Sequence, residues 1–300
     1  TSAVADAAIR RLVALAELSL GPAPAPYCVV AMGSLGRLEA GLGADQDTAI
    51  IVDDSGDASD QWYADLATAL TDGMERIGFP RCPGDIMATN PRWRQTVAGW
   101  RQTFRSWMNE PEPTAIMEAQ IFFDMRPVTG DVSLYASLSS DILTIAPRST
   151  RFLAHLAASA VQRNPPIGFF RNFVLERDGE HRNTLDLKHG GIAAVVQLAR
   201  LYCLTHGLAP VNTQTRLVAA HNAGAISQES TDNLSDAYEF ICYQRVRHQG
   251  RQIRDGVAPD NYVDPDELSD LDKKHLRDAF AVVRTMQGAL STTYQLGGLV

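Results

Sequence analysis

The sequence lacks any apolar run of about 18 residues, the length that an α-helix needs to cross a membrane. Cysteine is scarce: Cys28, Cys82, Cys203 and Cys242 are scattered, with no C-x-x-C pair and no ligand-like spacing to histidine. Excess basic charge is missing too, since the net charge is −8, which argues against a surface that binds nucleic acid by neutralising phosphates. We therefore expect a cytoplasmic protein with reduced core thiols and with neither a nucleic-acid nor a membrane partner.

What remains is an ordinary globular composition, with 45% hydrophobic and 21% charged residues over 300 positions. That length suffices for one large domain or two of moderate size, and a change in pattern favours two. Strand and helix patterns alternate up to about residue 131, and only helical patterns follow. We predict an α+β fold, with a small mixed-sheet domain over residues 1–131 and an all-helical bundle over residues 132–300. The predicted helices cover about 3–20, 59–77, 133–145, 150–163, 191–206, 213–223, 230–256 and 270–294.

One stretch combines features suited to phosphates and metal ions. The apolar runs Tyr27 to Met32 and Thr48 to Val52 have the length of buried strands. Gly33, directly after the first run, has no Cβ and allows close approach of a ligand, and Ser34 offers a hydroxyl and an N–H to a phosphate oxygen. A Gly-Ser pair after a strand is common in ordinary turns, so this part alone does not decide the function.

Two aspartates stand at the mouth of the second predicted strand. Asp45 and Asp47 alternate along the chain, so their side chains point to the same face. Carboxylates placed in this way repel each other unless a cation lies between them, and hard oxygen ligands suit Mg²⁺ bound together with substrate phosphates. Asp-x-Asp is also common at loop ends. The ordered combination of strand, Gly-Ser, Asp-x-Asp and strand favours a metal site over chance.

Residues 82–91 read as a loop that ends with Asn90 as an N-cap and Pro91 at the first position of a helix. That predicted helix carries a row of mostly aromatic side chains at helical spacing, which is more typical of a core than of a ligand platform. Its other face is basic, which is usual for a solvated surface, although such a face can also border an anionic substrate. The row is Trp93, Val97, Trp100, Phe104 and Trp107, and the basic face is Arg92, Arg94, Arg101 and Arg105.

A later stretch, Glu118 to Arg126, reads as a strand whose apolar run is Ile121 to Phe123. Asp124 would then lie at the end of a buried strand, with Arg126 facing the same way. The carboxylate is either half of an Asp–Arg pair or a third group of the metal site. Given Asp45 and Asp47, the metal interpretation leads.

In the helical half, Lys188 and the pair Gly190-Gly191 lie just ahead of a predicted helix. Two glycines there can bring N–H groups near an anion, and the lysine adds a point charge. An ordinary loop with an exposed lysine is the plainer interpretation, and the local sequence by itself favours it.

These segments resemble, in order, the motifs of bacterial nucleotidyltransferases of the DNA polymerase β-like superfamily. The chain is most similar to those with a helical substrate-binding domain that often follow cyclic-nucleotide-binding and CBS domains. The uridylyltransferase of the PII signal protein and the glutamine synthetase adenylyltransferase are related in pattern. The resemblance covers about residues 5–290 and is carried by Gly33-Ser34-x-Gly36-Arg37-x-Glu39, Asp45-x-Asp47, Met87-Ala88-x-Asn90-Pro91-x-Trp93, Phe123-Asp124-x-Arg126-Pro127-x-x-Gly130 and Asp186-x-Lys188-x-Gly190-Gly191-Ile192.

The resemblance implies a two-metal site in which Asp45, Asp47 and Asp124 hold two Mg²⁺ ions, for which Mn²⁺ is a substitute. It implies that Gly33 and Ser34 hold the triphosphate of ATP or UTP. Arg37 and Lys188 would neutralise that triphosphate, from the two domains. The acceptor would then have to enter a cleft between the domains.

The predicted function is transfer of AMP or UMP from the nucleotide to a hydroxyl of an acceptor, with release of pyrophosphate. The acceptor is expected to be a signalling protein, PII-like or another regulatory protein, or less favourably a small molecule. The alternative is a catalytically inactive, nucleotide-sensing binding module. The presence of all three aspartates argues against that alternative.

Overall fold

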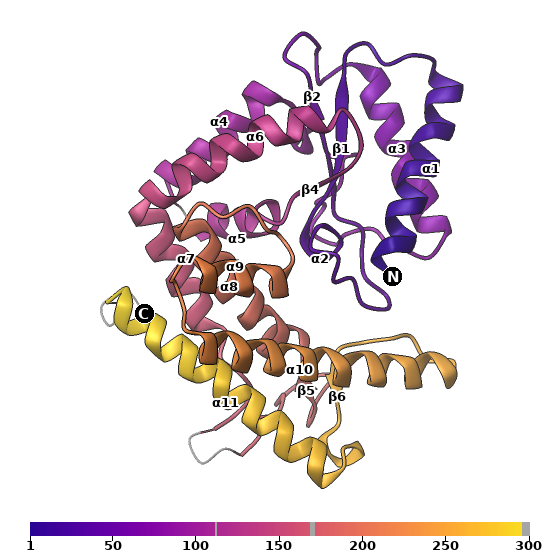
Figure 1. The fold of residues 1–300 in the computed structure, drawn as a ribbon. Coiled ribbons are helices and arrows are strands. Elements are labelled where there is room, and N and C mark those ends of the chain that lie inside the picture. The colour runs from indigo at the N-terminus through magenta and orange to yellow at the C-terminus, as the bar shows by residue number, and fades with distance from the viewer. Residues whose placement is uncertain (112, 169–171, 296–300) are drawn as a thin grey trace. The chain divides into compact units, whose positions relative to one another are not determined.

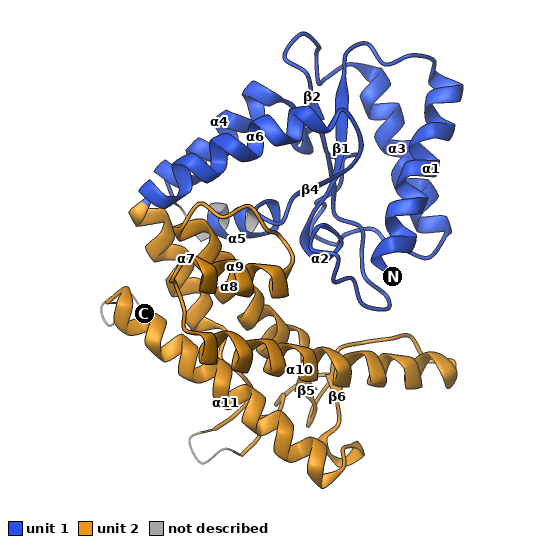
Figure 2. Ribbon diagram, viewed as in Figure 1, with its two compact units in different colours: residues 1–149 blue, residues 150–300 orange. Residues whose placement is uncertain are grey.

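The computed structural model describes residues 1–111, 113–168 and 172–295. The chain folds as two compact units, Thr1–Ser149 and Thr150–Val300 (Figure 2). Both predicted classes are found: the first unit contains a small mixed sheet with helices, and the second is almost entirely helical. The predicted α+β fold class is therefore confirmed.

The first unit is built on a four-stranded sheet with the strand order β3-β2-β1-β4. Strand β1 pairs antiparallel with both β2 and β4, while β2 pairs parallel with β3. Every residue of β1 and β2 is buried, because helices α1 and α3 cover one face of the sheet and α4 and α6 the other (Figure 1). Strands covered on both faces are apolar throughout, as the two runs predict. The strands are β1 Tyr27–Ala31, β2 Thr48–Val52, β3 Arg94–Thr96 and β4 Arg126–Gly130.

The helices of the first unit follow the predicted spans where the hydrophobic spacing is regular. Helix α1 packs along α3 to form the larger apolar core with one face of the sheet. The helices and helical turns are α1 Ser2–Leu20, α2 Gly33–Gly36, α3 Gln61–Arg76, η1 Pro91–Trp93, α4 Val97–Asn109, α5 Pro113–Phe122, α6 Val132–Ile145 and η2 Ala146–Arg148.

The predicted strand from Glu118 to Arg126 is wrong. This stretch completes helix α5, and the strand begins only at Arg126. Glu, Ala, Gln and Met favour a helix, and a short apolar run does not by itself distinguish a strand from a buried helical turn. Strand β4 tolerates Pro127 because it lies at the edge of the sheet. Asp124 therefore lies in the turn before an edge strand and not, as predicted, at the end of a buried strand.

The predicted single helix after Asn90 is also divided. Asn90 does cap a helical turn by accepting a hydrogen bond from the Arg92 N–H, but that turn is the short 3₁₀ segment η1, and β3 intervenes before α4. All five members of the aromatic row are nonetheless buried, so the core interpretation is confirmed. The solvated basic face is wrong for Arg94, which is buried and donates to the carbonyls of Ala88 (2.6 Å) and Thr89 (2.9 Å).

Tyr63 offers a direct test of how this unit is held together. Its hydroxyl is fully buried, donates to the Ala25 carbonyl (2.9 Å) and accepts from the Ala25 N–H (3.1 Å). Tyr63→Phe should lower the free energy of unfolding by about 2 kcal/mol, because both backbone groups lose their partner in the interior. Urea titration measures this loss. Tyr243→Phe, at a position 58% exposed, is the control and should leave stability unchanged.

The second unit is a bundle in which α8 is the most buried helix, packed against α7, α9 and α11. Its predicted helices are confirmed, and the two-residue strands β5 and β6 were missed because they are too short to show a pattern. Helix α6 belongs to the first unit through α4 and β4, so the compact units divide between Ser149 and Thr150, after the composition shift near residue 131. The elements are α7 Thr150–Gln162, β5 Leu185–Asp186, the π-helical turn η3 Lys188–Ile192, α8 Ala193–Thr205, α9 Thr213–Asn222, α10 Gln228–Arg254, β6 Tyr262–Val263, η4 Pro265–Glu267 and α11 Asp270–Thr293.

Within the described part of the chain, none of the helices combines the length and the apolar character needed to cross a membrane.

Candidate active site

The turn after β1 lies against the second aspartate. Gly33 adopts φ +54°, and a Cβ at this position would collide with the Asp47 carboxylate. The Met32 N–H donates to the Asp47 carbonyl (3.0 Å), and the Glu39 N–H donates to the Ser34 carbonyl (2.8 Å). A glycine is therefore needed here for two reasons, since the backbone conformation favours it and the carboxylate occupies the space of a side chain.

Asp45 and Asp47 converge as their spacing predicts, and a third potential ligand joins them. A carboxylate oxygen from each aspartate and the Cys82 sulfur all lie within 4.8 Å of one another. Asp47 is 8% exposed, and Asp45 is half-buried. Gln46, between them, is fully buried and donates its side-chain amide to the carbonyls of Thr71 (3.1 Å) and Phe79 (3.2 Å). The buried glutamine anchors the segment that presents the two carboxylates.

This donor set fits a divalent cation. Two carboxylates held this close repel each other, and a cation between them removes that cost. Their oxygens are the hard ligands that Mg²⁺ takes in phosphate-handling sites, with the remaining positions filled by water or by the substrate. The close contact between the Asp47 carboxylate and Gly33 orients one of these ligands before a cation binds.

Arg37 links the turn to Asp124. Its Nη1 donates to Asp124 Oδ2 (2.5 Å), and its Nε donates to Glu39 Oε2 (2.7 Å). The Asp124 side chain is fully buried. The structure therefore shows Arg37 between two carboxylates, where it positions Asp124 beside the turn. Its predicted contact with a triphosphate stays a prediction.

Asp124 is close to the turn in a second way, through its backbone. A Cβ at Gly36 would meet the carbonyl oxygens of Asp124 and Ala31, and Arg126 donates to the Gly36 carbonyl (3.0 Å). Among the described residues, however, the cluster of potential metal ligands that holds Asp45 and Asp47 contains Cys82 and not Asp124. Asp124 is therefore half of an ion pair, but its partner is Arg37 and not Arg126. Its coordination of a metal ion stays a prediction.

Cys82 is the site residue that the sequence did not reveal. The prediction of core thiols is confirmed for Cys28 and Cys203, whereas Cys82 and Cys242 are only half-buried. Burial and the Asp47 carboxylate raise the pKa of the Cys82 thiol to about 12. The one local signal was its place at the start of the loop that leads to the Met87 to Trp93 motif.

In the second unit, the predicted Lys188 segment forms the π-helical turn η3. The Asp186 carboxylate accepts from the His189 N–H (2.9 Å) and contacts His189 Nδ1 (2.7 Å), and these hydrogen bonds outweigh burial and lower the pKa of Asp186. Gly191 serves packing, since a Cβ there would lie 2.9 Å from Ile241 Cγ2. The Lys188 side chain is exposed, and its contact with nucleotide phosphates stays a prediction.

Comparison with known proteins agrees with these motifs over most of the chain. Residues 1–114 match the family model described as "Putative nucleotidyltransferase DUF294", and residues 150–294 match "Putative nucleotidyltransferase substrate binding domain". The chain belongs to this nucleotidyltransferase family. The first match includes the Gly33 to Asp47 segment of the first unit, and the second match includes the Asp186 to Ile192 segment of the second unit.

Two curated relatives of the chain are named bifunctional glutamine synthetase adenylyltransferase/adenylyl-removing enzyme. The protein from Streptomyces coelicolor is 24% identical over 268 residues, which is 82% of this chain and 25% of the relative. The protein from Corynebacterium glutamicum is 23% identical over 266 residues, which is 84% of this chain and 24% of the relative. The chain thus spans about a quarter of the length of these relatives.

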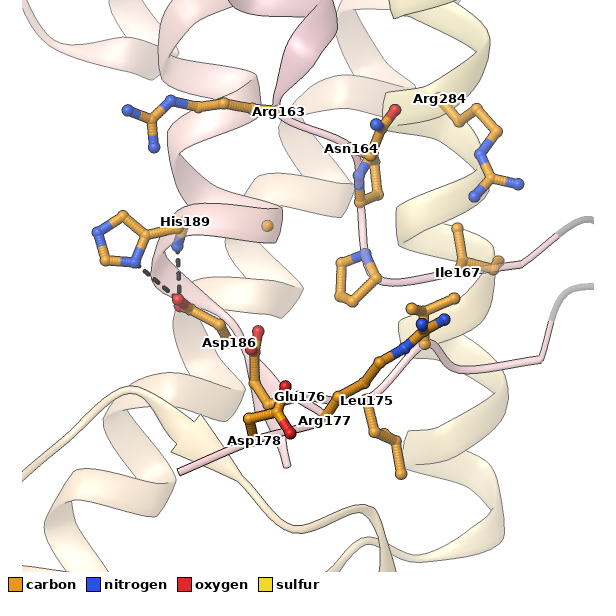
Figure 3. Close-up of a pocket in the computed structure, with 14 residues that line it drawn as sticks. Arg163, Asn164, Ile167, Leu175, Glu176, Arg177, Asp178, Asp186, His189 and Arg284 are labelled. Carbon is orange, nitrogen blue, oxygen red and sulfur yellow. Dashed lines mark hydrogen bonds and ion pairs between the residues drawn. The ribbon is translucent and has the colours of Figure 1, made fainter. Parts of the chain in front are cut away.

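The second unit contains a pocket of about 670 Å³ (Figure 3). In that view Asp186 and His189 lie on one side of the pocket, and Leu175, Glu176 and Asp178 form its floor. Asn164 and Arg284 lie at the opposite side from that floor. The lining mixes carboxylates, guanidinium groups and an imidazole, so it suits a polar ligand more than an apolar one.

The close contact between Gly33 and the Asp47 carboxylate predicts a specific loss of activity when Gly33 is substituted. Gly33→Ala should lower the rate of nucleotidyl transfer by about a hundredfold, because the new methyl group displaces the Asp47 carboxylate, which we expect to bind the metal ion. Gly21→Ala is the matched control, since Gly21 also has a positive φ (+79°) but has nothing within 4 Å of its Cβ position. Both variants should lose about 1–3 kcal/mol of stability through backbone strain. Equal activity in the two variants would contradict the assignment.

Proposed function

We propose that the chain transfers AMP or UMP from ATP or UTP to a hydroxyl of an acceptor protein, with Mg²⁺ at Asp45 and Asp47 and with release of pyrophosphate. The observation that carries the proposal is the convergence of these two carboxylates against the glycine turn that follows β1. Family membership supports nucleotidyl transfer in general, and the names of the two relatives favour a protein acceptor.

In the proposed reaction, the acceptor oxygen attacks the α-phosphorus, a new O–P bond forms, and the bond to the β-phosphate oxygen breaks. Mg²⁺, when bound, would neutralise charge on the phosphates and lower the pKa of the attacking hydroxyl, and two ions sharing the site would divide these tasks. Asp45 and Asp47 hold the cation, and Gly33 and Ser34 approach the triphosphate through their N–H groups. The proton of the hydroxyl passes to a carboxylate of the site, for which Asp124 is our candidate.

Arg37 has a positioning role in this proposal. It orients the Asp124 carboxylate from one side while Glu39 holds the guanidinium from the other. Lys188, on the second unit, is proposed to contact the nucleotide phosphates as a point charge.

The decisive experiment incubates the purified chain with each α-labelled NTP, Mg²⁺ and a bacterial lysate, and follows labelled protein bands after electrophoresis. We expect one NTP to give a labelled band that EDTA removes and that the Asp47→Asn protein does not produce. Binding of an NTP with Mg²⁺ in a calorimeter, without a labelled band, pyrophosphate release or a labelled small molecule, would instead support a nucleotide-sensing module.

A further inference from the structure

The proposed reaction assigns no role to the thiol of Cys82, which lies beside the carboxylates of Asp45 and Asp47. Cys82 is brought within ligand distance of Asp45 and Asp47 from a segment more than thirty residues along the chain, and the three potential ligand atoms lie within 4.8 Å of one another. Two oxygen ligands and one sulfur ligand are a different donor set from the all-oxygen set that Mg²⁺ prefers.

Main-chain bonds hold the Cys82 loop to the aspartate segment on both sides of the thiol. Before Cys82, the Gln46 N–H donates to the Pro80 carbonyl (3.0 Å), and Gln46 forms an isolated parallel bridge with Arg81. After it, the Thr48 N–H donates to the Ile86 carbonyl (3.1 Å). Because these contacts involve the residues next to Asp45 and Asp47, they tie the backbone of the Cys82 loop to the segment that carries the two carboxylates.

The turn that follows Cys82 is braced by the Asn90-Pro91-x-Trp93 motif. Asp85 adopts φ +54°, and its N–H donates to the Cys82 carbonyl (3.0 Å). Asn90 Nδ2 donates to Asp85 Oδ2 (2.9 Å), and Trp93 Nε1 donates to the Asp85 carbonyl (2.9 Å). The Asn90-Pro91-x-Trp93 motif has no role in the proposed reaction. Through these hydrogen bonds it supports the turn that follows Cys82.

We propose that Cys82 is a third protein ligand at the Asp45–Asp47 site and that it lets the site bind a thiophilic divalent cation, Zn²⁺ or Co²⁺, in competition with Mg²⁺. Sulfur ligands select such cations, whereas Mg²⁺ takes oxygen ligands. Binding exchanges the thiol proton for a metal–sulfur bond, and the proton goes to solvent. The inference rests on the proposed function only for the placement of a cation at the two aspartates.

The test titrates the reduced chain with Co²⁺ and follows the near-ultraviolet charge-transfer absorption of a cobalt–thiolate bond. We expect the band to saturate at one ion per chain and to disappear when Zn²⁺ is added. Cys82→Ser should remove the band and weaken Zn²⁺ binding by roughly tenfold or more. Cys242→Ser, which alters another half-buried thiol, is the matched control and should keep the band.

A second measurement works on the unmodified protein, in case Cys82→Ser fails to fold. Zn²⁺ should slow alkylation of Cys82 by iodoacetamide, measured by peptide mass spectrometry, and should leave alkylation of Cys242 unchanged. Absence of the cobalt band, or alkylation of Cys82 at the same rate with and without Zn²⁺, would overturn the inference. A normal band with no nucleotidyl transfer would refute the proposed function alone, and transfer without a band would refute the role of Cys82 alone.

Discussion

Asp47→Asn is expected to abolish Mg²⁺-dependent pyrophosphate release, with a loss of roughly a thousandfold or more. A metal ion stabilises the charge of the transition state by several kcal/mol, and about 4 kcal/mol corresponds to a thousandfold in rate. The asparagine keeps the shape of the buried side chain but loses the charge that attracts the cation. Pyrophosphate release with each NTP measures the loss, and the thermal midpoint without Mg²⁺ shows whether the fold is intact.

The control for this experiment is Asp57→Asn. Asp57 lies in the same unit, is exposed, and its carboxylate accepts hydrogen bonds from the N–H (2.8 Å) and hydroxyl (2.7 Å) of Ser59. It therefore changes the net charge equally without touching the site. We expect full activity for Asp57→Asn and the same loss for Asp45→Asn as for Asp47→Asn. Undiminished turnover in both site variants would refute the assignment of the metal ligands.

Arg37→Ala is expected to have the largest effect on stability, a loss of about 3–5 kcal/mol. The substitution leaves the fully buried Asp124 carboxylate without the guanidinium that donates to it at 2.5 Å. Loss of a charged donor to a buried carboxylate costs more than loss of a surface contact, because water does not replace the donor in the interior. Chemical denaturation monitored by tryptophan fluorescence measures the change.

Two further variants test whether the loss of stability comes from the buried charge of Asp124 or from a general loss of packing. In Arg37→Ala/Asp124→Asn the buried group is neutral, so part of the stability should return relative to Arg37→Ala alone. Arg10→Ala removes an exposed arginine whose nearest carboxylate contact, with Asp6, is 4.0 Å, and should change stability by less than about 1 kcal/mol. An Arg37→Ala protein as stable as Arg10→Ala would contradict a structural role for the Arg37–Asp124 pair.

Local periodicity carried most of the fold prediction. The long helices of the second unit and strands β1 and β2 follow from hydrophobic spacing, which reports the geometry of neighbouring residues. The prediction failed where two states compete over a few residues. Glu118 to Phe122 completes a helix and the strand starts at Arg126, since an apolar run of three residues fits either state and packing decides between them.

For the site, too, the prediction succeeded for residues close together in sequence and failed for a contact between remote residues. Asp45 and Asp47 were expected to share a face because they are two residues apart at a strand end, and they do converge. The partner of Asp124 was misjudged, because the nearby Arg126 was the obvious candidate while the observed partner, Arg37, is 87 residues away in sequence. Spacing along a chain carries no information about such a pair.

By itself, the sequence determined the family and the residues that we propose carry the chemistry, namely the glycine turn after β1 and the two aspartates ahead of β2. Only the tertiary structure decided what surrounds them. It placed Gly33 against the Asp47 carboxylate, Arg37 on Asp124 and the Cys82 sulfur beside the carboxylate pair. The physical reason is that side-chain type and local geometry are written residue by residue, whereas a contact between remote segments exists only once the chain has packed.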